Sequence, residues 1–184
     1  APDLEDGHPA DLLRALRDAG IPAALAGGLA TNAWVSKDQL RVTYDVYVAV
    51  LIPLDMDFSA ERVAESISSQ SGIRCFHGSD LEFPKVRMIR LVTSPQGTVM
   101  DLLIADRNFT ASALARTGEV ELGGERHPIL SPTDLVLFKG LGRREKDHLA
   151  IASIAASQKL NKRYIERWAR KLGIWGFVSR ALKC

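Results

Sequence analysis

Two aspartates in apolar surroundings are the residues whose type and spacing could do chemistry. Asp45 comes just before the apolar run Val46–Leu54, and Asp101 interrupts the run Val99–Ile104. A carboxylate within an apolar strand is costly unless it is paired or binds a cation. Because carboxylate oxygens suit Mg²⁺, the two aspartates are candidate metal ligands. For each aspartate considered by itself, we favour the alternative of an edge-strand residue paired with a basic neighbour.

A glycine pair precedes the first of these aspartates. Gly27 and Gly28 follow a predicted strand at Ala23–Ala26 and precede a predicted helix at Leu29–Val35. Glycines let a phosphate approach the backbone, and a helix N-terminus offers unbonded N–H groups and the positive end of its dipole. The pair is therefore a candidate phosphate-binding turn, although many such turns use two glycines only for tight packing.

Tyr47 shares a face with Asp45 in the predicted strand Val42–Ile52. The period of two places Asp45, Tyr47 and Ala49 together, and it places the alternating valines on the opposite, core face. A phenol ionises at about pH 10, so at neutral pH Tyr47 is uncharged and a poor ligand for Mg²⁺. Its bulky ring points to the face where ions and phosphates would lie.

The elements that must position these residues are a mixed sheet followed by helices. Strands are predicted at Lys85–Thr93 and Thr98–Ile104, and the turn Ser94–Gly97 predicts a hairpin between them. We expect an α+β fold in which residues 1–130 form a core with a mixed β-sheet flanked by helices. Residues 131–184 form a helical, basic C-terminal region packed on that core. Further helices are predicted at Pro9–Ala19, Ser59–Ser69, Ala111–Arg116, Pro132–Lys139, Lys146–Ser157 and Asn161–Leu172, and a second hairpin at Glu119–Leu122 and His127–Leu130.

Composition excludes several classes of protein. The chain has 184 residues, of which 46% are hydrophobic, as in a globular domain with a sizeable core. Its apolar runs are too short to span a bilayer. The acidic start, Ala1–His8, predicts no secretory signal, and two cysteines argue against a disulfide scaffold or a zinc cluster. We therefore expect a cytoplasmic protein.

Positive charge is concentrated at the C-terminal end. From Lys139 to Cys184 the chain has 12 Lys/Arg against 3 Asp/Glu, a net charge of +9, whereas the first 138 residues carry −7. Such a block suits a phosphate-bearing partner, either NTP or RNA. A solvated helix face is an equally weighted alternative.

The order of these features resembles the nucleotidyltransferase superfamily. After Gly27-Gly28, the segment Arg41-Val42-Thr43-Tyr44-Asp45-Val46-Tyr47 matches R-x-T-x-D-x-D except at its last position, and Asp101 follows in a later strand. Leu130-Ser131-Pro132-Thr133-Asp134-Leu135, with Lys139, Arg144, Lys146 and Asp147, resembles the family's L-S-P-x-D-L…K…R-x-K-D helix pair. The likeness is closest to abortive-infection (AbiEii) type toxins and related stand-alone nucleotidyltransferases, from about residue 10 to residue 157.

This resemblance implies an enzyme that moves NMP from an NTP to a hydroxyl of RNA, such as tRNA, or of a protein. One or two Mg²⁺ ions are the implied cofactors, and a cognate antitoxin is an implied partner. By position, Asp45 is the first metal carboxylate, and Asp101 is the third and the base for the acceptor hydroxyl. The resemblance further implies that Gly27 and Gly28 support the phosphates and that Lys139 contacts the nucleotide. Arg41 and Thr43 lie at the start of the strand that carries Asp45, and Lys146 and Asp147 form a supporting pair.

Tyr47 stands where the family has its second metal carboxylate. Three accounts of it stay open: a natural pseudoenzyme, a one-metal enzyme, or an inactivating change in a toxic enzyme. Two further hypotheses accompany the metal-dependent transferase. One is a non-catalytic nucleotide- or partner-binding protein on the same fold. The other is an RNA-binding module that uses the basic C-terminal helices.

Overall fold

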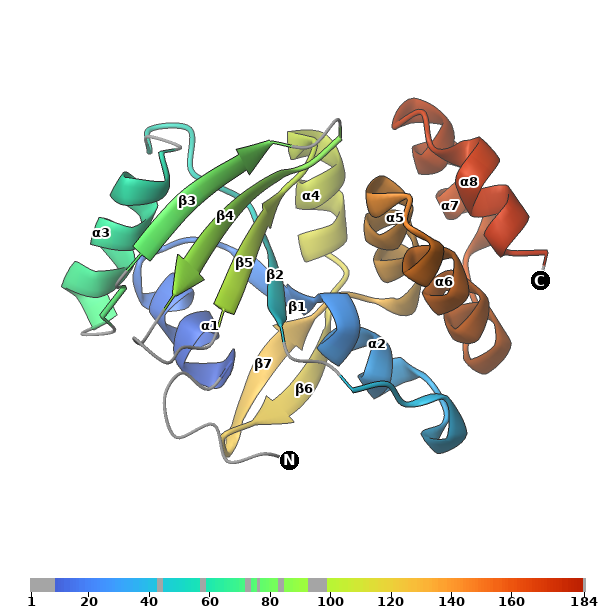
Figure 1. Ribbon diagram of the computed structural model, residues 1–184, viewed down its shortest axis with the longest axis horizontal. Coiled ribbons are helices and arrows are strands. Elements are labelled where there is room, and N and C mark those ends of the chain that lie inside the picture. Colours follow the sequence, from blue (N-terminus) through green and yellow to red (C-terminus); the bar gives the residue numbers. More distant parts are fainter. Residues whose placement is uncertain are drawn as a thin grey trace.

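The computed structural model describes residues 9–42, 45–56, 59–71, 74–75, 77–82, 85–92 and 99–183. Within them, strands and helices are interspersed up to Ile129, and only helices follow (Figure 1). The elements follow in the order α1 (Pro9–Asp18), β1 (Ala23–Ala26), α2 (Gly27–Trp34), the 3₁₀ helix η1 (Lys37–Gln39), β2 (Val46–Val50), α3 (Ala60–Ser71), β3 (His77–Glu82), β4 (Arg87–Val92), β5 (Val99–Ile104), α4 (Arg107–Leu114), β6 (Gly118–Leu122), β7 (Glu125–Ile129), α5 (Pro132–Gly142), α6 (Glu145–Ser157), α7 (Lys162–Lys171) and α8 (Trp175–Ala181).

The described strands form one mixed sheet in the order β3-β4-β5-β2-β1-β7-β6. β2 runs parallel to β5 and antiparallel to β1, and β4 runs antiparallel to both β3 and β5. The register pairs Tyr47 with Asp101 and Asp101 with Arg90. Because paired residues share a face of a sheet, Tyr47, Asp101 and Arg90 form one row across three neighbouring strands.

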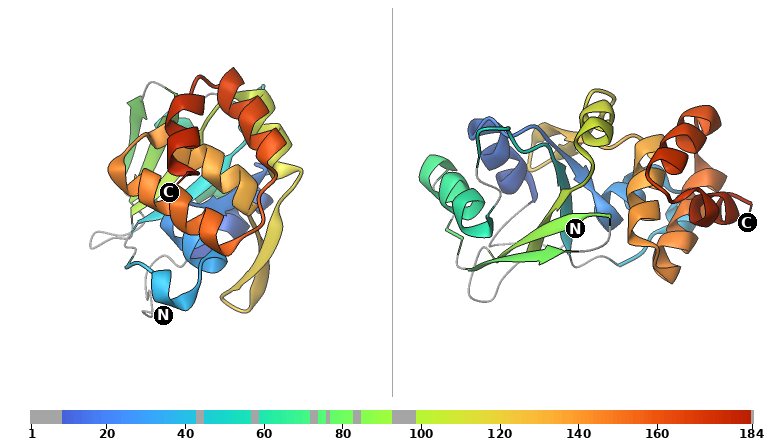
Figure 2. Two further views of the ribbon diagram at one scale, coloured as in Figure 1. Left: turned by 90° about the vertical axis from the view of Figure 1, so that its right-hand side faces the viewer. Right: turned by 90° about the horizontal axis from the view of Figure 1, so that it is seen from above.

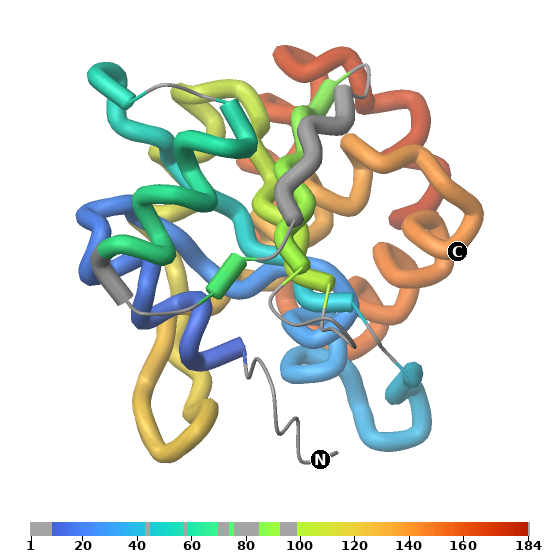
Figure 3. The backbone as a smooth tube through the Cα atoms, turned by 60° about the vertical axis from the view of Figure 1, so that its left-hand side comes forward, coloured from blue at the N-terminus to red at the C-terminus, as the bar shows by residue number. Residues whose placement is uncertain are grey.

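Helices lie on both sides of this sheet. Figure 2 shows α1 and α3 on one side and α5 to α8 on the other. The face that carries Tyr47 is turned toward α5, because Tyr47 and Leu103 line a cavity together with Leu135 and Phe138 of α5. α2 lies beside α5 and α6, although they are far apart in the sequence (Figure 3).

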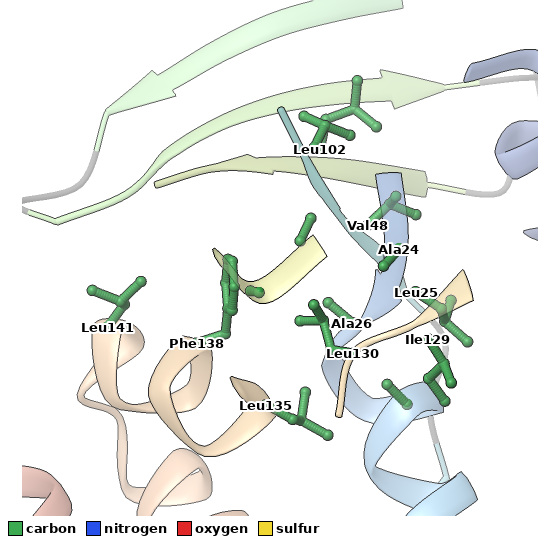
Figure 4. Close-up of a cluster of buried hydrophobic side chains, with 14 of the residues drawn as sticks. Ala24, Leu25, Ala26, Val48, Leu102, Ile129, Leu130, Leu135, Phe138 and Leu141 are labelled. Atoms are coloured by element: carbon green, nitrogen blue, oxygen red, sulfur yellow. The ribbon is translucent and has the colours of Figure 1, made fainter. Parts of the chain in front are cut away.

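Helix α5 joins the sheet to the other C-terminal helices. The Ser131 hydroxyl accepts a hydrogen bond from the Asp134 backbone N–H, and Pro132 occupies the first turn, so the sequence favours a helix start there. The buried core reaches from the strands into α5, where Leu135 and Leu137 are fully buried. Figure 4 shows this cluster, with Ala24, Leu25, Ala26, Val48, Leu102, Ile129 and Leu130 beside Leu135, Phe138 and Leu141.

The predicted fold class, an α+β fold with a mixed sheet, is confirmed. β1 is found where it was predicted, whereas α2 begins at Gly27 rather than Leu29 and β2 is shorter than Val42–Ile52. β3 and α8 were not predicted, because β3 lacks an apolar alternation and α8 is only 7 residues long. The turn Ser94–Gly97 lies outside the described residues. No helix in the described part of the chain is long and apolar enough to cross a membrane.

Candidate functional site

A cavity of about 650 Å³ lies between the Tyr47 face of the sheet and helices α2, α5 and α6. It brings together most of the site residues predicted from the sequence, namely Gly27, Gly28, Arg41, Asp45, Tyr47, Lys139, Lys146 and Asp147. Asp101 is not part of its lining, and Thr43 lies outside the described residues. Residues that are 120 positions apart in the sequence, from Gly27 to Asp147, therefore meet at one place because α5 and α6 fold back over the sheet.

Gly27 is the point at which β1 turns into α2. Its φ of 67° lies in the left-handed region, which favours glycine. A Cβ built on Gly27 would lie 2.7 Å from Cβ and from Cδ2 of Tyr47, closer than such atoms approach. Tight packing therefore explains Gly27, and the Tyr47 ring covers the first residue of the turn. Ala26, the N-cap of α2, provides no side-chain hydrogen bond to the first N–H groups of the helix.

Tyr47 is half-buried and remains a neutral phenol at physiological pH. Burial is the main reason that its pKa is raised above the ordinary 10.0, and the negative charges of Asp101 and Asp45 add to the rise. The Arg144 guanidinium opposes this rise through its interaction with the hydroxyl. The phenol thus places a neutral group between two carboxylates and a cation.

Asp101 is held by an arginine that the sequence analysis did not single out. Arg90 Nε donates to Oδ1 of Asp101 at 2.8 Å, and Arg90 Nη2 donates to Oδ2 at 2.9 Å. The Asp101 side chain is 0% exposed, whereas that of Arg90 is 36% exposed. The alternative of an aspartate paired with a basic neighbour is therefore confirmed for Asp101. Its expected position on an edge strand is wrong, because β5 lies between β4 and β2.

The second buried carboxylate, Asp147, organises the cations of α5 and α6. Arg144 Nε donates to Asp147 Oδ2 at 2.7 Å, and the Lys139 ammonium lies 3.8 Å from Oδ1. Burial lowers the pKa of Lys139 below the ordinary 10.5; Asp147 opposes this, while the positive charges of Arg144, Lys146 and Arg41 contribute to it. Lys139 therefore lies in a cluster of like charges that an anion would relieve.

The remaining lining divides into a cationic part and an apolar part. Arg41, Lys85 and Arg143 add positive charge at exposed positions. Arg143 has a φ of 54°, unusual for a residue with a Cβ, and its Nη2 donates to the Gly173 carbonyl at 2.8 Å. The apolar part combines Met88 and Leu103 from the sheet with Leu135, Phe138 and Leu141 from α5.

Asn32 is a lining residue that the sequence analysis missed. Its amide nitrogen donates to the Arg41 carbonyl at 2.8 Å, and its amide oxygen accepts from the Arg41 N–H at 3.2 Å. These two bonds fix the segment before β2 against α2 and so hold Arg41 at the cavity. Nothing in the local sequence indicates this pairing, because it joins a helix to an irregular segment.

The donor set does not fit the two-ion magnesium centre that the resemblance implies. Both oxygens of Asp101 accept from Arg90, and Asp147 is bound by Arg144 and Lys139. Tyr47, which the resemblance aligns with the remaining carboxylate, is a neutral phenol. Among the residues that the structure describes, no three acidic, histidine or cysteine side chains converge as a metal site would require. Asp45 is the lining carboxylate that remains for such an ion.

Two basic residues of α7, Arg170 and Lys171, are not part of the cavity lining and make local contacts. Arg170 forms an ion pair with Glu166 at 2.7 Å and lies over the ring of Trp175. The Lys171 ammonium lies 5.0 Å from the centre of a Trp168 ring. Part of the positive charge counted in the sequence therefore stabilises the helical region, and another part lines the cavity.

A comparison with solved structures shows that the fold is similar to that of a nucleotidyltransferase-like protein. An antigenic nucleotidyltransferase-like protein from Paracoccidioides brasiliensis is 17% identical, and the match covers 97% of this chain and 94% of that one with a TM-score of 0.50. At this identity the likeness shows the fold. No family model and no curated protein matches the sequence.

Two polymerases resemble the chain more distantly. The polymerase core of TRAMP, an RNA surveillance complex, is 9% identical over 94% of this chain and 54% of its own, with a TM-score of 0.40. The Cid1 poly(U) polymerase, bound to Mg and 3′-dATP, is 15% identical over 84% of this chain and 44% of its own, with a TM-score of 0.34. The chain thus matches about half the length of these polymerases.

Proposed function

We propose that this protein binds a nucleoside polyphosphate in the cavity without catalysing transfer. The observation that carries the proposal is the combination of a cationic cluster and an apolar surface in one cavity, next to carboxylates that are already paired with arginine or lysine. A cavity of about 650 Å³ falls within the usual size range of small-molecule sites. The cationic part and the apolar part of the lining together indicate the class of ligand.

The cationic part suits the phosphates. Lys139, Arg144 and Lys146 lie at the junction of α5 and α6, and Gly28 in the uncapped first turn of α2 also lines the cavity, next to Gly27, which the Tyr47 ring covers. Lysine and arginine bind phosphate oxygens through charge-assisted hydrogen bonds, and a helix N-terminus favours anions. An anion would also offset the mutual repulsion that lowers the pKa of Lys139.

The apolar part suits a nucleobase. Phe138 and Leu141 of α5 line the same cavity as Leu103 and Met88 of the sheet. A flat aromatic base gains from burial against such side chains, whereas inorganic phosphate uses the cationic part of the cavity and gains nothing from the apolar part. The proposal therefore predicts that ATP binds more tightly than pyrophosphate.

Calorimetry tests this proposal. ATP, ADP, AMP and pyrophosphate are titrated into the protein, once with Mg²⁺ and once with EDTA. We expect affinity to increase with the number of phosphates, to be higher for ATP than for pyrophosphate, and to be similar in the two buffers. Absence of ATP binding in both buffers would refute the proposal.

A matched pair of variants locates the site. Lys146→Gln removes an exposed charge from the cavity lining, and Lys162→Gln removes an exposed charge from α7, away from the cavity. We expect weaker ATP binding from Lys146→Gln and native binding from Lys162→Gln. Equal losses would indicate non-specific attraction to the basic region instead.

Metal-dependent transfer is the second candidate, favoured by the position of Asp45 on the cavity wall beside the Gly27-Gly28 turn. In this case one Mg²⁺ is held by Asp45 and by the phosphates of the NTP, and the acceptor is a hydroxyl of tRNA or of a protein. A toxin of the AbiEii type with a cognate antitoxin is the corresponding biological role. The native chain and Tyr47→Asp are each incubated with labelled NTP, tRNA and protein. Transfer of the label to tRNA or protein distinguishes the two candidates. Label transfer by the native chain that is lost in Asp45→Asn would favour the enzyme.

A further inference from the structure

We propose that Arg90 is a built-in cation that neutralises the carboxylate centre, defined as Asp45, Asp101 and Tyr47, in place of a divalent ion. This inference rests on the proposed function and deepens it, because a centre already neutralised by Arg90 needs no Mg²⁺ beside a phosphate ligand in the cavity. It assigns the loss of the metal site to two residues rather than to Tyr47 alone. The consequence is that restoring the missing aspartate does not by itself restore a metal site.

Arg90 contacts both oxygens of the Asp101 carboxylate, as a metal ion bound in bidentate fashion would. Its Nε and Nη2 contact the two oxygens of Asp101 at 2.8 and 2.9 Å, so neither oxygen keeps its full capacity for a further ligand. The fork of the guanidinium matches the carboxylate, and this geometry gives the strongest class of ion pair. Opposite residues of β4 and β5 fix the pair, because Arg90 and Asp101 face each other in the register.

The position of Arg90 makes it a neighbour of the whole centre. Tyr47 is beside Asp101 on the next strand, so Arg90, Asp101 and Tyr47 form one row. Asp45 lies two residues before Tyr47 on the same side of the chain, and its negative charge favours the charged form of Arg90. A fixed positive charge at this place repels a divalent ion and at the same time removes the cost of the buried Asp101 carboxylate.

Tyr47 and Arg90 therefore change the centre in complementary ways. Tyr47 replaces one negative charge with a neutral group, and Arg90 cancels a second one. Arg144 is a second fixed cation next to this centre. It interacts with the Tyr47 hydroxyl and with Asp147. The centre is organised around guanidinium groups, which cannot leave, whereas a metal ion would exchange with solvent.

Manganese binding tests the proposal without any nucleotide. Mn²⁺, a spectroscopic substitute for Mg²⁺, is titrated into the native chain, Tyr47→Asp, Arg90→Met and Tyr47→Asp/Arg90→Met, and bound ion is measured by electron paramagnetic resonance. We expect the double variant to bind Mn²⁺ at least about 10-fold more tightly than Tyr47→Asp, because the double variant frees both oxygens of Asp101 and Tyr47→Asp does not. Binding by Tyr47→Asp that equals that of the double variant would overturn the proposal.

Two controls complete the test. Adding Asp101→Asn to the double variant removes the carboxylate, and we expect Mn²⁺ binding to be lost; persistent binding would place the ion elsewhere and contradict the proposal. If Arg90→Met does not fold, as judged by circular dichroism, Arg90→Gln takes its place. The glutamine amide can donate to one oxygen of Asp101 and leaves the other open. Tyr47→Asp/Arg90→Gln should therefore still bind Mn²⁺ more tightly than Tyr47→Asp. ATP affinity in EDTA tests the proposed function separately, so the two can fail independently.

Discussion

Tyr47 and Gly27 are packed against each other so closely that neither position can be understood without the other. A Cβ on Gly27 would lie 2.7 Å from the Tyr47 Cβ and 2.9 Å from its Cγ. The antiparallel register of β1 and β2, which pairs Ala26 with Tyr47, brings the ring over the turn. In a phosphate-binding turn an open glycine would face the ligand, whereas here the ring of Tyr47 covers it. Tyr47 therefore determines the shape of this part of the cavity and contributes an uncharged group to its lining.

This packing predicts a large loss of stability for Gly27→Ala. The substitution combines a left-handed backbone with a steric overlap, so we expect a loss of roughly 2–5 kcal/mol in the free energy of unfolding. Urea denaturation measures it. Gly124→Ala is the matched control, because Gly124 has a φ of 78° and nothing within 4 Å of an added Cβ.

The control isolates backbone strain, for which we expect a loss of about 1 kcal/mol. In a Tyr47→Gly background, which also removes the Cβ at this position, the overlap disappears, and the cost of Gly27→Ala should fall to that of Gly124→Ala. If Gly27→Ala costs the same in both backgrounds, the Tyr47 contact does not determine the conformation of the turn.

Tyr47 also predicts a loss of stability at alkaline pH. Its pKa is raised in the folded protein, above the ordinary 10.0 that applies to the unfolded chain. As pH rises through about 10, the unfolded chain releases the phenolic proton and the folded protein keeps it, so the stability contributed by this group is lost. Tyr47→Phe cannot ionise, and its free energy of unfolding should therefore decline less than that of the native protein between neutral pH and high pH. Parallel curves from pH-dependent urea denaturation would show that the pKa of Tyr47 is not raised by folding.

The hairpin of β4 and β5 shows how far the sequence could lead. The predicted four-residue turn at Ser94–Gly97 would pair Val92 with Val99 and, in the same register, Arg90 with Asp101; β4 and β5 have this register. The partner of Asp101 could therefore have been found by counting back from the predicted turn. The turn by itself predicts only a hairpin, and the register that follows from it identifies Arg90 as the partner of Asp101.

Other parts of the site depend on contacts between distant segments, which local patterns do not encode. The cavity exists because α5 and α6 lie against α2 and the sheet, and the orientation of these helices is set by buried residues such as Leu135 and Ile151. The overlap of Tyr47 with Gly27 likewise requires the register of β1 and β2, whose connection contains a helix and an irregular segment. Residue types and order predicted the members of the site, and tertiary packing decides which of them face the cavity.

From the lowered pKa of Lys139, we expect ATP binding to weaken at alkaline pH. Burial and neighbouring cations lower its pKa below the ordinary 10.5, so the ammonium loses its proton earlier in the pH scale than an exposed lysine does. The charged form binds phosphate, and affinity should therefore decrease as pH rises through this lowered pKa. Calorimetry in buffers with different enthalpies of ionisation should also detect proton uptake when ATP binds. Lys139→Arg keeps its charge over this range and should show a flatter pH profile; a profile identical to the native one would assign the effect to another group.

We expect substitutions of Arg143 to change ATP affinity without a large change in the stability of the fold. Its φ of 54° carries a backbone cost that glycine avoids, while its side chain lines the cavity and donates to Gly173. In Arg143→Gly, relief of this cost offsets the lost hydrogen bond and the greater freedom of the unfolded chain, so we expect stability within about 1 kcal/mol of native. Loss of the guanidinium should weaken ATP binding by about 3- to 10-fold. Arg143→Asn, which tolerates the left-handed conformation but has no charge, should weaken binding to the same extent. Thermal unfolding and calorimetry measure the two effects, and a large loss of stability with native ATP affinity would show that Arg143 serves the contact with Gly173 rather than the ligand.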